Sequence, residues 1–396
     1  MTRQIRILHV VPSLDASYGG PSYSVPSLAR ALEPFGVASR FLSTAAAGQE
    51  SRNPHMEGFE EAWDEVRRPT DRALGYYTTG ARAAAARVIE EGAVDVVHLH
   101  SLWNHLSATL FSAAQGMEVP FVLSPRSELL PGSLEKSRLK KRVATVLYAR
   151  RLLERAAGFH ATDETERACI EPYAKGRPIV LAGNGIDMDL GEHLPGREAA
   201  LGLLGLPADR RYVLYMSRLH ARKGPDLLLE AATKAGMAER GWSLLYTGSD
   251  SEGALLPKLK ARATELGLSS HVHFAGQVEG PRKMACLAAA SAFALPTKFE
   301  NFGNAITEAM VCGLPILTTP YTPWTEVVQG GAGWIAERNS EDLSRALSDL
   351  FGTDAETLAR MGATPRPHLA AHSWEAAAAR MAGFYRDDVM GRGRRS

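Results

Sequence analysis

The sequence is short of cysteine, of net charge and of long apolar runs, and each shortage excludes a class of protein. Its 396 residues include only three cysteines. None forms a Cys-x-x-Cys pair, which excludes a zinc ribbon or disulfide framework and favours a reducing compartment. The 45 basic and 44 acidic side chains give a net charge of +1, which argues against a nucleic-acid coat. The apolar run 5–11 is too short and too interrupted for a signal peptide or a membrane span. We therefore expect a cytosolic protein.

The chain also lacks the Gly-x-Gly-x-x-Gly fingerprint after its first apolar run, which counts against a nicotinamide enzyme. In its place stand Gly19 and Gly20, and Pro21 begins a helical pattern. Glycines at the end of a strand let the backbone approach a ligand closely. The glycine pair is therefore a candidate ligand loop.

Short apolar runs alternate with longer amphipathic stretches along the chain, in two successive series. This alternation predicts an α/β protein with parallel sheets flanked by helices. Two series predict two doubly wound, Rossmann-like domains, 1–188 and 189–372, followed by a last helix within 373–396. The stretch from the domain boundary to Asp209 contains several Gly and Pro residues, and we expect it to be a linker.

The densest motif lies within 295–319, where a strand, a loop and a helix follow one another. Glu300 falls in the predicted loop, and Glu308 falls in a helix that begins near Asn304. Both carboxylates can then face one crevice, where the free amides of 302–305 and the helix dipole favour a phosphate. The alternative is a surface helix with two solvated glutamates, which the surrounding glycines and the Gly-x-Pro turn argue against.

Two cations follow another predicted strand, which ends near Met216. Arg218 and Lys223 would lie at its carboxyl end, where ligands bind in doubly wound sheets. A planar guanidinium and a compact ammonium group together can neutralise a pyrophosphate. The alternative for this pair by itself is an ordinary basic loop.

These motifs, together with the boundary motif Asn184–Asp187 and a final Ser-Trp-Glu helix, resemble family 4 of the glycosyltransferases, a retaining family with the GT-B fold. The resemblance implies two Rossmann-like domains that face each other across a cleft. The N-terminal domain would bind the acceptor, the C-terminal domain would bind the nucleotide sugar, and the last helix would cross back to the first domain.

The resemblance also implies roles for individual residues. Glu308 would hold the ribose, Glu300 the donor sugar, and Arg218 with Lys223 the diphosphate. The amides of 302–305 would lie beside the diphosphate, and the loop at Val278 would meet the nucleobase. The implied catalytic residues are Glu300, Arg218 and Lys223, and the implied donor-binding residues are Gly19, Gly20, Val278, Asn301, Phe302, Gly303, Asn304 and Glu308.

The sequence departs from the family pattern at one position of the N-terminal domain. Members of the family often carry a histidine after a strand there, and this chain has Arg126. Three alternatives stay open: Arg126 takes over the electrostatic role, His100 or His105 does so on the acceptor side, or the acceptor site is organised differently. We favour Arg126 as a site residue.

The resemblance implies no cofactor and no metal, with the nucleoside diphosphate sugar as the donor substrate. Fixed cations and amides can stabilise the charge that grows on the leaving diphosphate. The triplet Asp187–Asp189 matches the Asp-x-Asp motif of metal-dependent glycosyltransferases. We regard this match as accidental, because it lies at the domain boundary and short motifs often arise by chance.

The segment 136–155 carries eight basic residues and one acidic residue, with apolar residues between them. Such a helix can lie on an anionic membrane surface. The alternatives are a solvated face or a patch for a phosphorylated acceptor.

The motifs and the resemblance together predict a glycosyltransferase that moves a hexose to a glycan or a polyprenyl-linked glycan, in cell-surface polysaccharide synthesis. That the transfer retains the configuration of the sugar is implied by the resemblance alone. It would be cytoplasmic or peripheral on the inner face of the membrane. One alternative is a nucleotide-sugar epimerase of the same fold, for which no convincing set of acid and base residues is seen. The other is a non-catalytic nucleotide-sugar-binding subunit, which would be expected to have lost Glu300, Lys223 or Glu308.

Overall fold

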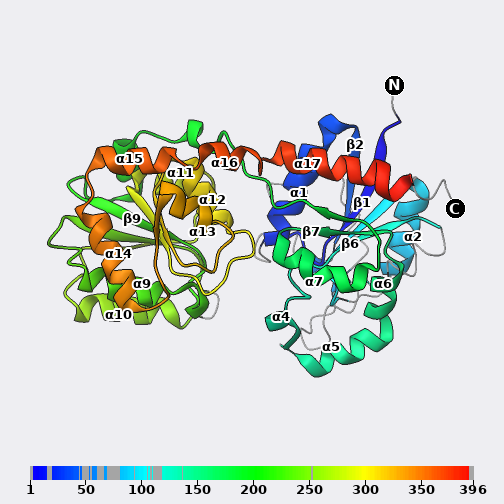
Figure 1. The fold of residues 1–396 in the computed structure, drawn as a ribbon, viewed down its shortest axis with the longest axis horizontal. Coiled ribbons are helices and arrows are strands. Elements are labelled where there is room, and N and C mark those ends of the chain that lie inside the picture. Colours follow the sequence, from blue (N-terminus) through cyan, green and yellow to red (C-terminus); the bar gives the residue numbers. More distant parts are fainter. Residues whose placement is uncertain are drawn as a thin grey trace. The chain divides into compact units, whose positions relative to one another are not determined.

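The chain divides into two units, and each is described by itself. Unit 1 comprises residues 1–185 and 374–396, and unit 2 comprises residues 186–373. Figure 1 shows both units as ribbons with the elements labelled. The structure, a computed structural model, describes residues 3–15, 20–43, 45–46, 53, 56–59, 67–68, 81–92, 94–104, 106–107, 109, 118–135, 137–250 and 253–391.

Unit 1 is built on a six-stranded sheet in the order β2-β1-β5-β6-β7-β8, in which every pair is parallel. Its central strands are fully buried, as expected where helices cover both faces of a parallel sheet. Two short strands form a separate ladder. The strands are β1 (Ile5–Val10), β2 (Val37–Leu42), β3 (Ala45–Ala46), β4 (Arg67–Arg68), β5 (Val96–His100), β6 (Phe121–Ser124), β7 (Gly158–Ala161) and β8 (Ile179–Leu181).

Helix α17 returns to unit 1 after the chain has formed the whole of unit 2, and it packs on α1. Met381 and Tyr385 are completely buried, so the C-terminal helix is part of this core. A Cβ on Gly185 would lie only 2.1 Å from the ring of Trp374. The helices of the unit are α1 (Gly20–Leu32), α2 (Ala81–Gly92), α4 (Pro131–Glu135), α5 (Arg138–Ala144), a π-helical turn (Thr145–Ala149), α6 (Arg150–Arg155), α7 (Glu164–Ala174), α17 (Trp374–Gly383) and a π-helical end (Phe384–Met390).

Unit 2 repeats the plan with the sheet order β11-β10-β9-β12-β13-β14, again parallel throughout. The prediction of two doubly wound parallel sheets is thereby confirmed. The strands are β9 (Arg211–Met216), β10 (Trp242–Thr247), β11 (Val272–Gly276), β12 (Ala292–Leu295), β13 (Ile316–Thr318) and β14 (Gly333–Ile335). The helices are α8 (Arg197–Leu204), α9 (Pro225–Lys234), α10 (Leu255–Glu265), α11 (Gly280–Ala289), α12 (Asn304–Val311), α13 (Thr325–Val327), α14 (Ser340–Gly352), α15 (Ala355–Ala363) and α16 (Arg366–Ala370).

The expected linker up to Asp209 is wrong, because this stretch belongs to the fold of unit 2. It contains a short 3-10 helix and the whole of α8, which packs against α11. Ala200 and Leu201 are buried in the core of the unit. The glycine at 191 lies so close to α12 that a Cβ would be 2.7 Å from the carbonyl oxygen of Val311. Gly and Pro here shape a tight connection rather than a loose one.

Within the described residues, no helix has the length and apolar character needed to cross a membrane.

Candidate functional site

The sheet of unit 2 has a switch point between β9 and β12, its two central neighbours. From β9 the chain runs outward through β10 and β11, and it then returns to add β12 on the other side of β9. The chain therefore leaves β9 and β12 in opposite directions along the sheet, and the loops after both strands lie at its carboxyl edge. Ligands of doubly wound sheets bind at this position. Lys223 follows β9 and Glu300 follows β12, so the fold brings the two predicted motifs together.

Backbone contacts hold the two loops against each other. Gly224 has a φ of +68°, and a Cβ there would lie 2.6 Å from the carbonyl oxygen of Pro296. A residue with a side chain would be strained at this φ and would collide, so glycine is required. The amide of Lys298 donates to the carbonyl of Arg222 at 2.7 Å. The loops that carry the two candidate site residues are thus held in contact with each other.

Arg338, in the loop after β14, donates hydrogen bonds to both of these loops. Its Nε donates to the carbonyl of Pro296 at 3.1 Å, and its Nη2 donates to the carbonyl of Ala221 at 2.5 Å. The sequence analysis missed this residue, since no local pattern connects it to loops that lie far away in the sequence. It acts on the site by positioning the backbone.

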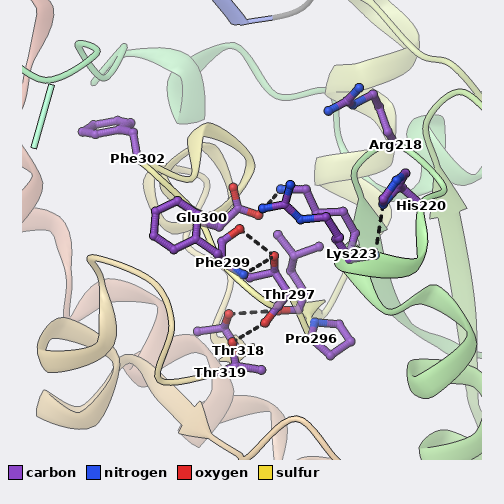
Figure 2. A network of polar contacts seen from close by, with 12 residues as sticks. Arg218, His220, Lys223, Pro296, Thr297, Phe299, Glu300, Phe302, Thr318 and Thr319 are labelled. Carbon is purple, nitrogen blue, oxygen red and sulfur yellow. Dashed lines mark hydrogen bonds and ion pairs between the residues drawn. The ribbon is translucent and has the colours of Figure 1, made fainter. Parts of the chain in front are cut away.

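The centre of the site is an ion pair between Lys223 Nζ and Glu300 Oε1 (Figure 2). Both side chains are mostly shielded, with exposed fractions of 20% for Lys223 and 12% for Glu300. The amide of Glu300 donates to the carbonyl of Tyr321 at 3.1 Å, which fixes the loop behind the carboxylate. Burial raises the pKa of the nearby Tyr215 hydroxyl, and the charge of Glu300 raises it further.

Helix α12 begins directly after this loop. Gly303 caps it with a φ of +79°, and its carbonyl accepts from the amides of Ile306 at 2.9 Å and Thr307 at 3.1 Å. The amides before Ile306 therefore have no acceptor within the helix and form its partially positive end. Phe302 is buried, and its carbonyl accepts from Trp324 Nε1 at 2.5 Å. Of the two predicted asparagines, Asn301 is half-buried and Asn304 is exposed.

Glu308 has a partner that the sequence analysis did not include. Lys283 Nζ, on α11, lies 2.6 Å from Glu308 Oε1. Burial and the charge of Glu308 raise the pKa of the adjacent Cys312 thiol to about 12, so this cysteine is not a reactive thiolate. The position of Lys283 five residues after the Val278 loop was the only sequence signal that could have indicated it.

The remaining residues of the predicted donor site are less closely joined. Arg218 is exposed and makes no ion pair among the described residues; its carbonyl accepts from the Tyr215 hydroxyl at 3.1 Å. In Figure 2 no dashed line connects its guanidinium to Lys223 or Glu300. Val278 packs partly against the core of unit 2. Gly20 begins α1 in unit 1, with nothing within 4 Å of a Cβ, and Gly19 lies outside the described residues.

Unit 1 has a second polar cluster at its own switch point, between β1 and β5. Arg126 follows β6 with a φ of 54°, a conformation that costs energy for a residue other than glycine. Its Nη2 donates to His100 Nδ1 at 3.1 Å, and its Nη1 donates to Asn184 Oδ1 at 3.2 Å. Two of the three alternatives for the missing family histidine, Arg126 and His100, are thus in direct contact. His105 lies outside the described residues.

The hydrogen bonds of this cluster determine where its protons lie. Because Arg126 donates to His100 Nδ1, the neutral ring of His100 carries its proton on Nε2, which lies 3.1 Å from His9 Nδ1. His9 then donates from Nε2 to Ser39 Oγ at 3.3 Å. A continuous chain of hydrogen bonds therefore runs from Arg126 through two histidines to Ser39.

All the histidines of this cluster are buried and held neutral. Burial, and then the charge of Arg126, lower the pKa of His9 to about 3. Burial likewise lowers the pKa of His160 to about 3, although its Nε2 donates to the Ala182 carbonyl at 2.7 Å. His98 has a lowered pKa for the same reason, and its Nδ1 lies 2.6 Å from the hydroxyl of Tyr385.

Three of these rings, His9, His98 and His100, bring their nitrogens within 4.8 Å of one another, a spacing that would suit a metal ion. The hydrogen-bond chain already uses both nitrogens of His9 and of His100. A guanidinium also contacts the cluster, and its charge opposes a second cation. The donor set fits a neutral hydrogen-bonded network better than a metal centre.

Two family models match the chain and together span most of it. Residues 198–366 match the model described as glycosyl transferases group 1, and residues 19–185 match that of a glycosyl transferase 4-like domain. The chain is 27% identical over 345 residues to D-inositol 3-phosphate glycosyltransferase 1 of Catenulispora acidiphila, which covers 82% of this chain and 78% of that protein. In the next relatives of that name the match spans about half of their length.

Solved structures show the same fold over nearly the whole chain. Sucrose-phosphate synthase from Thermosynechococcus elongatus has a TM-score of 0.74 at 21% identity, covering 97% of this chain and 99% of that one. HepE from Anabaena, solved in complex with UDP-glucose, has a TM-score of 0.73 at 18% identity, with 96% and 98% covered. At these identities the likeness shows the fold alone.

Proposed function

Because the chain belongs to the family 4 glycosyltransferases of GT-B fold, which transfer a sugar from a nucleotide sugar, we propose that it is a retaining, metal-independent hexosyltransferase. Its acceptor is a glycan or a polyprenyl-linked glycan, and it serves cell-surface polysaccharide synthesis on the cytosolic side of the membrane. Unit 2 binds the donor, and unit 1 binds the acceptor. The observation that carries the proposal is the ion pair of Lys223 with Glu300 at the switch point, beside the start of α12.

The chemistry of these groups suits the departure of a nucleoside diphosphate. As the bond from the sugar to the diphosphate breaks, negative charge grows on the phosphate oxygens. Lys223, Arg218 and the partially positive start of α12 can stabilise this charge. These three features supply the positive charge that a metal ion would otherwise supply, which is the basis for proposing metal independence.

The carboxylates have a different task in this proposal. Glu300 accepts hydrogen bonds from hydroxyl groups of the donor sugar, and Lys223 orients it while contacting the diphosphate. Glu308 accepts from the ribose hydroxyls and is oriented by Lys283. In unit 1, Arg126 with His100 behind it lies on the acceptor side. The partly buried ion pair of Lys223 and Glu300 thus serves two substrate groups at once.

The first experiment measures nucleotide recognition and turnover separately. Thermal shift with UDP-, GDP- and TDP-sugars identifies the base, because selective stabilisation follows affinity. Release of nucleoside diphosphate from the stabilising donor is then measured with and without acceptor glycans. We expect nucleoside diphosphate to be released from the donor that stabilises the chain. Binding of a nucleotide with no release from any donor of the panel would instead support the non-catalytic subunit.

Two further readouts address the finer statements. Activity after exhaustive chelation with EDTA is expected to stay unchanged, and loss that Mg²⁺ or Mn²⁺ restores would contradict metal independence. The anomeric configuration of the product, read by NMR coupling constants, is expected to match that of the donor. An inverted product would contradict retention while leaving donor binding intact.

A further inference from the structure

Helix α5 and the π-helical turn after it present aliphatic side chains to solvent. Leu139 is 75% exposed, Val143 54%, Val146 82% and Leu147 66%. The described part of the chain has eight large hydrophobic side chains that are exposed, and four of them lie within residues 139–147. Such a gathering of apolar surface marks an interaction site rather than ordinary surface variation. We call these four residues the α5 stripe.

The stripe is not the face by which this helix packs on its own unit. The segment is anchored on its unit by residues that follow the stripe in the chain, of which Ala149, Leu152 and Leu153 are buried in the core of unit 1. Lys141 also turns inward, donating to the carbonyl of Ser133 and lying 5.6 Å from the ring of Trp103. Figure 1 shows α5 at the periphery of its unit, away from the strands. The segment therefore carries apolar side chains that the core of unit 1 covers and others, in the stripe, that it leaves exposed.

Basic side chains surround the stripe. Among the described residues of 137–155 the one acidic side chain is Glu154, and it is already paired with Arg150 at 2.9 Å. The exposed cations of the segment, apart from Arg150, are Arg138, Lys140, Arg142, Arg151 and Arg155, and Lys136 of the predicted basic segment lies outside the described residues. The surface thus combines exposed aliphatic groups with an excess of positive charge.

We propose that the α5 stripe and its cations dock on an anionic lipid membrane. The helix would lie in the plane of the interface, with its aliphatic side chains among the upper acyl chains and its cations on the headgroup phosphates. Amphipathic interfacial helices have this combination of apolar and basic groups. A contact between two copies of the chain is less favourable, because the same basic side chains would then face each other. The inference concerns unit 1 alone and does not depend on the donor chemistry proposed above.

The test uses co-sedimentation with vesicles of phosphatidylglycerol and phosphatidylcholine in equal parts, compared with pure phosphatidylcholine. We expect the full chain to bind the anionic vesicles at low salt and to bind more weakly as salt screens the charges. The double variant L139S/V146S is expected to lower the partition coefficient by about tenfold or more, since each change removes an inserted apolar group. Leu203→Ser, at a leucine of unit 2 that is 53% exposed, is the matched control and is expected to leave binding unchanged.

A second measurement distinguishes insertion from simple charge attraction. In Val146→Trp the added indole is expected to be quenched by brominated lipids in the anionic vesicles, beyond the quenching of the wild-type chain. Leu203→Trp is its control and is expected to show no added quenching. Thermal denaturation and nucleotide binding of the variants are expected to match the wild type, because the stripe lies outside the donor site.

Three results would overturn the proposal. The first is absence of binding to anionic vesicles at low salt, and the second is binding by L139S/V146S that equals the wild type. The third is a dimer in sedimentation velocity that L139S/V146S abolishes while vesicle binding is absent, because the stripe would then be a contact between two copies of the chain.

Discussion

Lys283 Nζ lies 2.6 Å from Glu308 Oε1 and joins helix α11 to helix α12 at the proposed nucleotide site. The exposed fractions of the two side chains, 29% and 28%, leave the pair accessible to a ligand. In our proposal the lysine therefore orients the Glu308 carboxylate toward the ribose hydroxyls.

Replacing Lys283 by alanine is expected to weaken nucleoside diphosphate affinity by about tenfold, because an oriented, partly buried charge pair contributes on the order of 1 kcal/mol. The turnover number should change much less, since Lys283 contacts no reacting group in our proposal. Isothermal titration and steady-state kinetics separate the two effects. Arg282→Ala, an exposed cation on the same helix, is the matched control, and an equal loss in both variants would contradict a specific role for Lys283.

The pair of Lys223 and Glu300 is expected to matter for turnover. Glu300→Gln and Lys223→Met should each lower kcat by a factor on the order of 10² to 10³, because each removes a group that meets the transition state. Since the two side chains act as one unit, the double variant should lose far less than the product of the single losses. Arg222→Ala, at the exposed neighbour of Lys223, should retain activity. Independent, multiplicative losses would show that the pair is not a functional unit.

Arg126 offers a test of the acceptor side. Arg126→Ala is expected to reduce turnover with little change in donor affinity, because the residue lies in unit 1 and its partners are His100 and Asn184. Arg126→Lys should recover only part of the activity, since an ammonium group cannot match the fork that donates to both partners. Initial rates at saturating donor measure this. Unchanged activity in Arg126→Ala would remove the residue from the site.

The buried histidines predict a loss of stability in mild acid. In the unfolded chain a histidine titrates near pH ~6.5, whereas burial lowers the native pKa of His9 and of His160 to about 3. Below pH ~6.5 the unfolded state binds protons that the native state does not. Stability is therefore complete above that pH and falls with decreasing pH, by about 1.4 kcal/mol per pH unit for each such histidine.

Urea denaturation between pH ~7.5 and ~5 measures this effect through the free energy of unfolding. His160→Gln keeps a donor for the Ala182 carbonyl and should make the pH dependence shallower. The exposed His193 provides the control, since His193→Gln should leave the slope unchanged. A slope that His160→Gln does not alter would mean that this histidine is not the source of the acid sensitivity.

Local patterns were sufficient for the fold class and for the strand, loop and helix that carry Glu300 and Glu308. The alternation of apolar runs and helices predicted both parallel sheets, and the glycines around Glu300 predicted the loop before α12. Such signals are short in range, because the period of a strand or helix and the conformational needs of a turn are visible within a few residues. The linker prediction failed for a related reason, since Gly and Pro mark a change of direction without showing whether the chain packs there.

By itself, then, the sequence determined the two parallel sheets, the loop and helix that carry Glu300 and Glu308, and the basic character of 136–155. Only the tertiary structure decided which groups meet. Lys223 and Glu300 are 77 residues apart, Lys283 and Glu308 are 25 apart, and Tyr385 reaches His98 across 287. It also decided which apolar side chains of 138–155 are buried and which are left exposed. Contacts and burial of this kind depend on how elements pack in three dimensions, and no local period in the sequence specifies that packing.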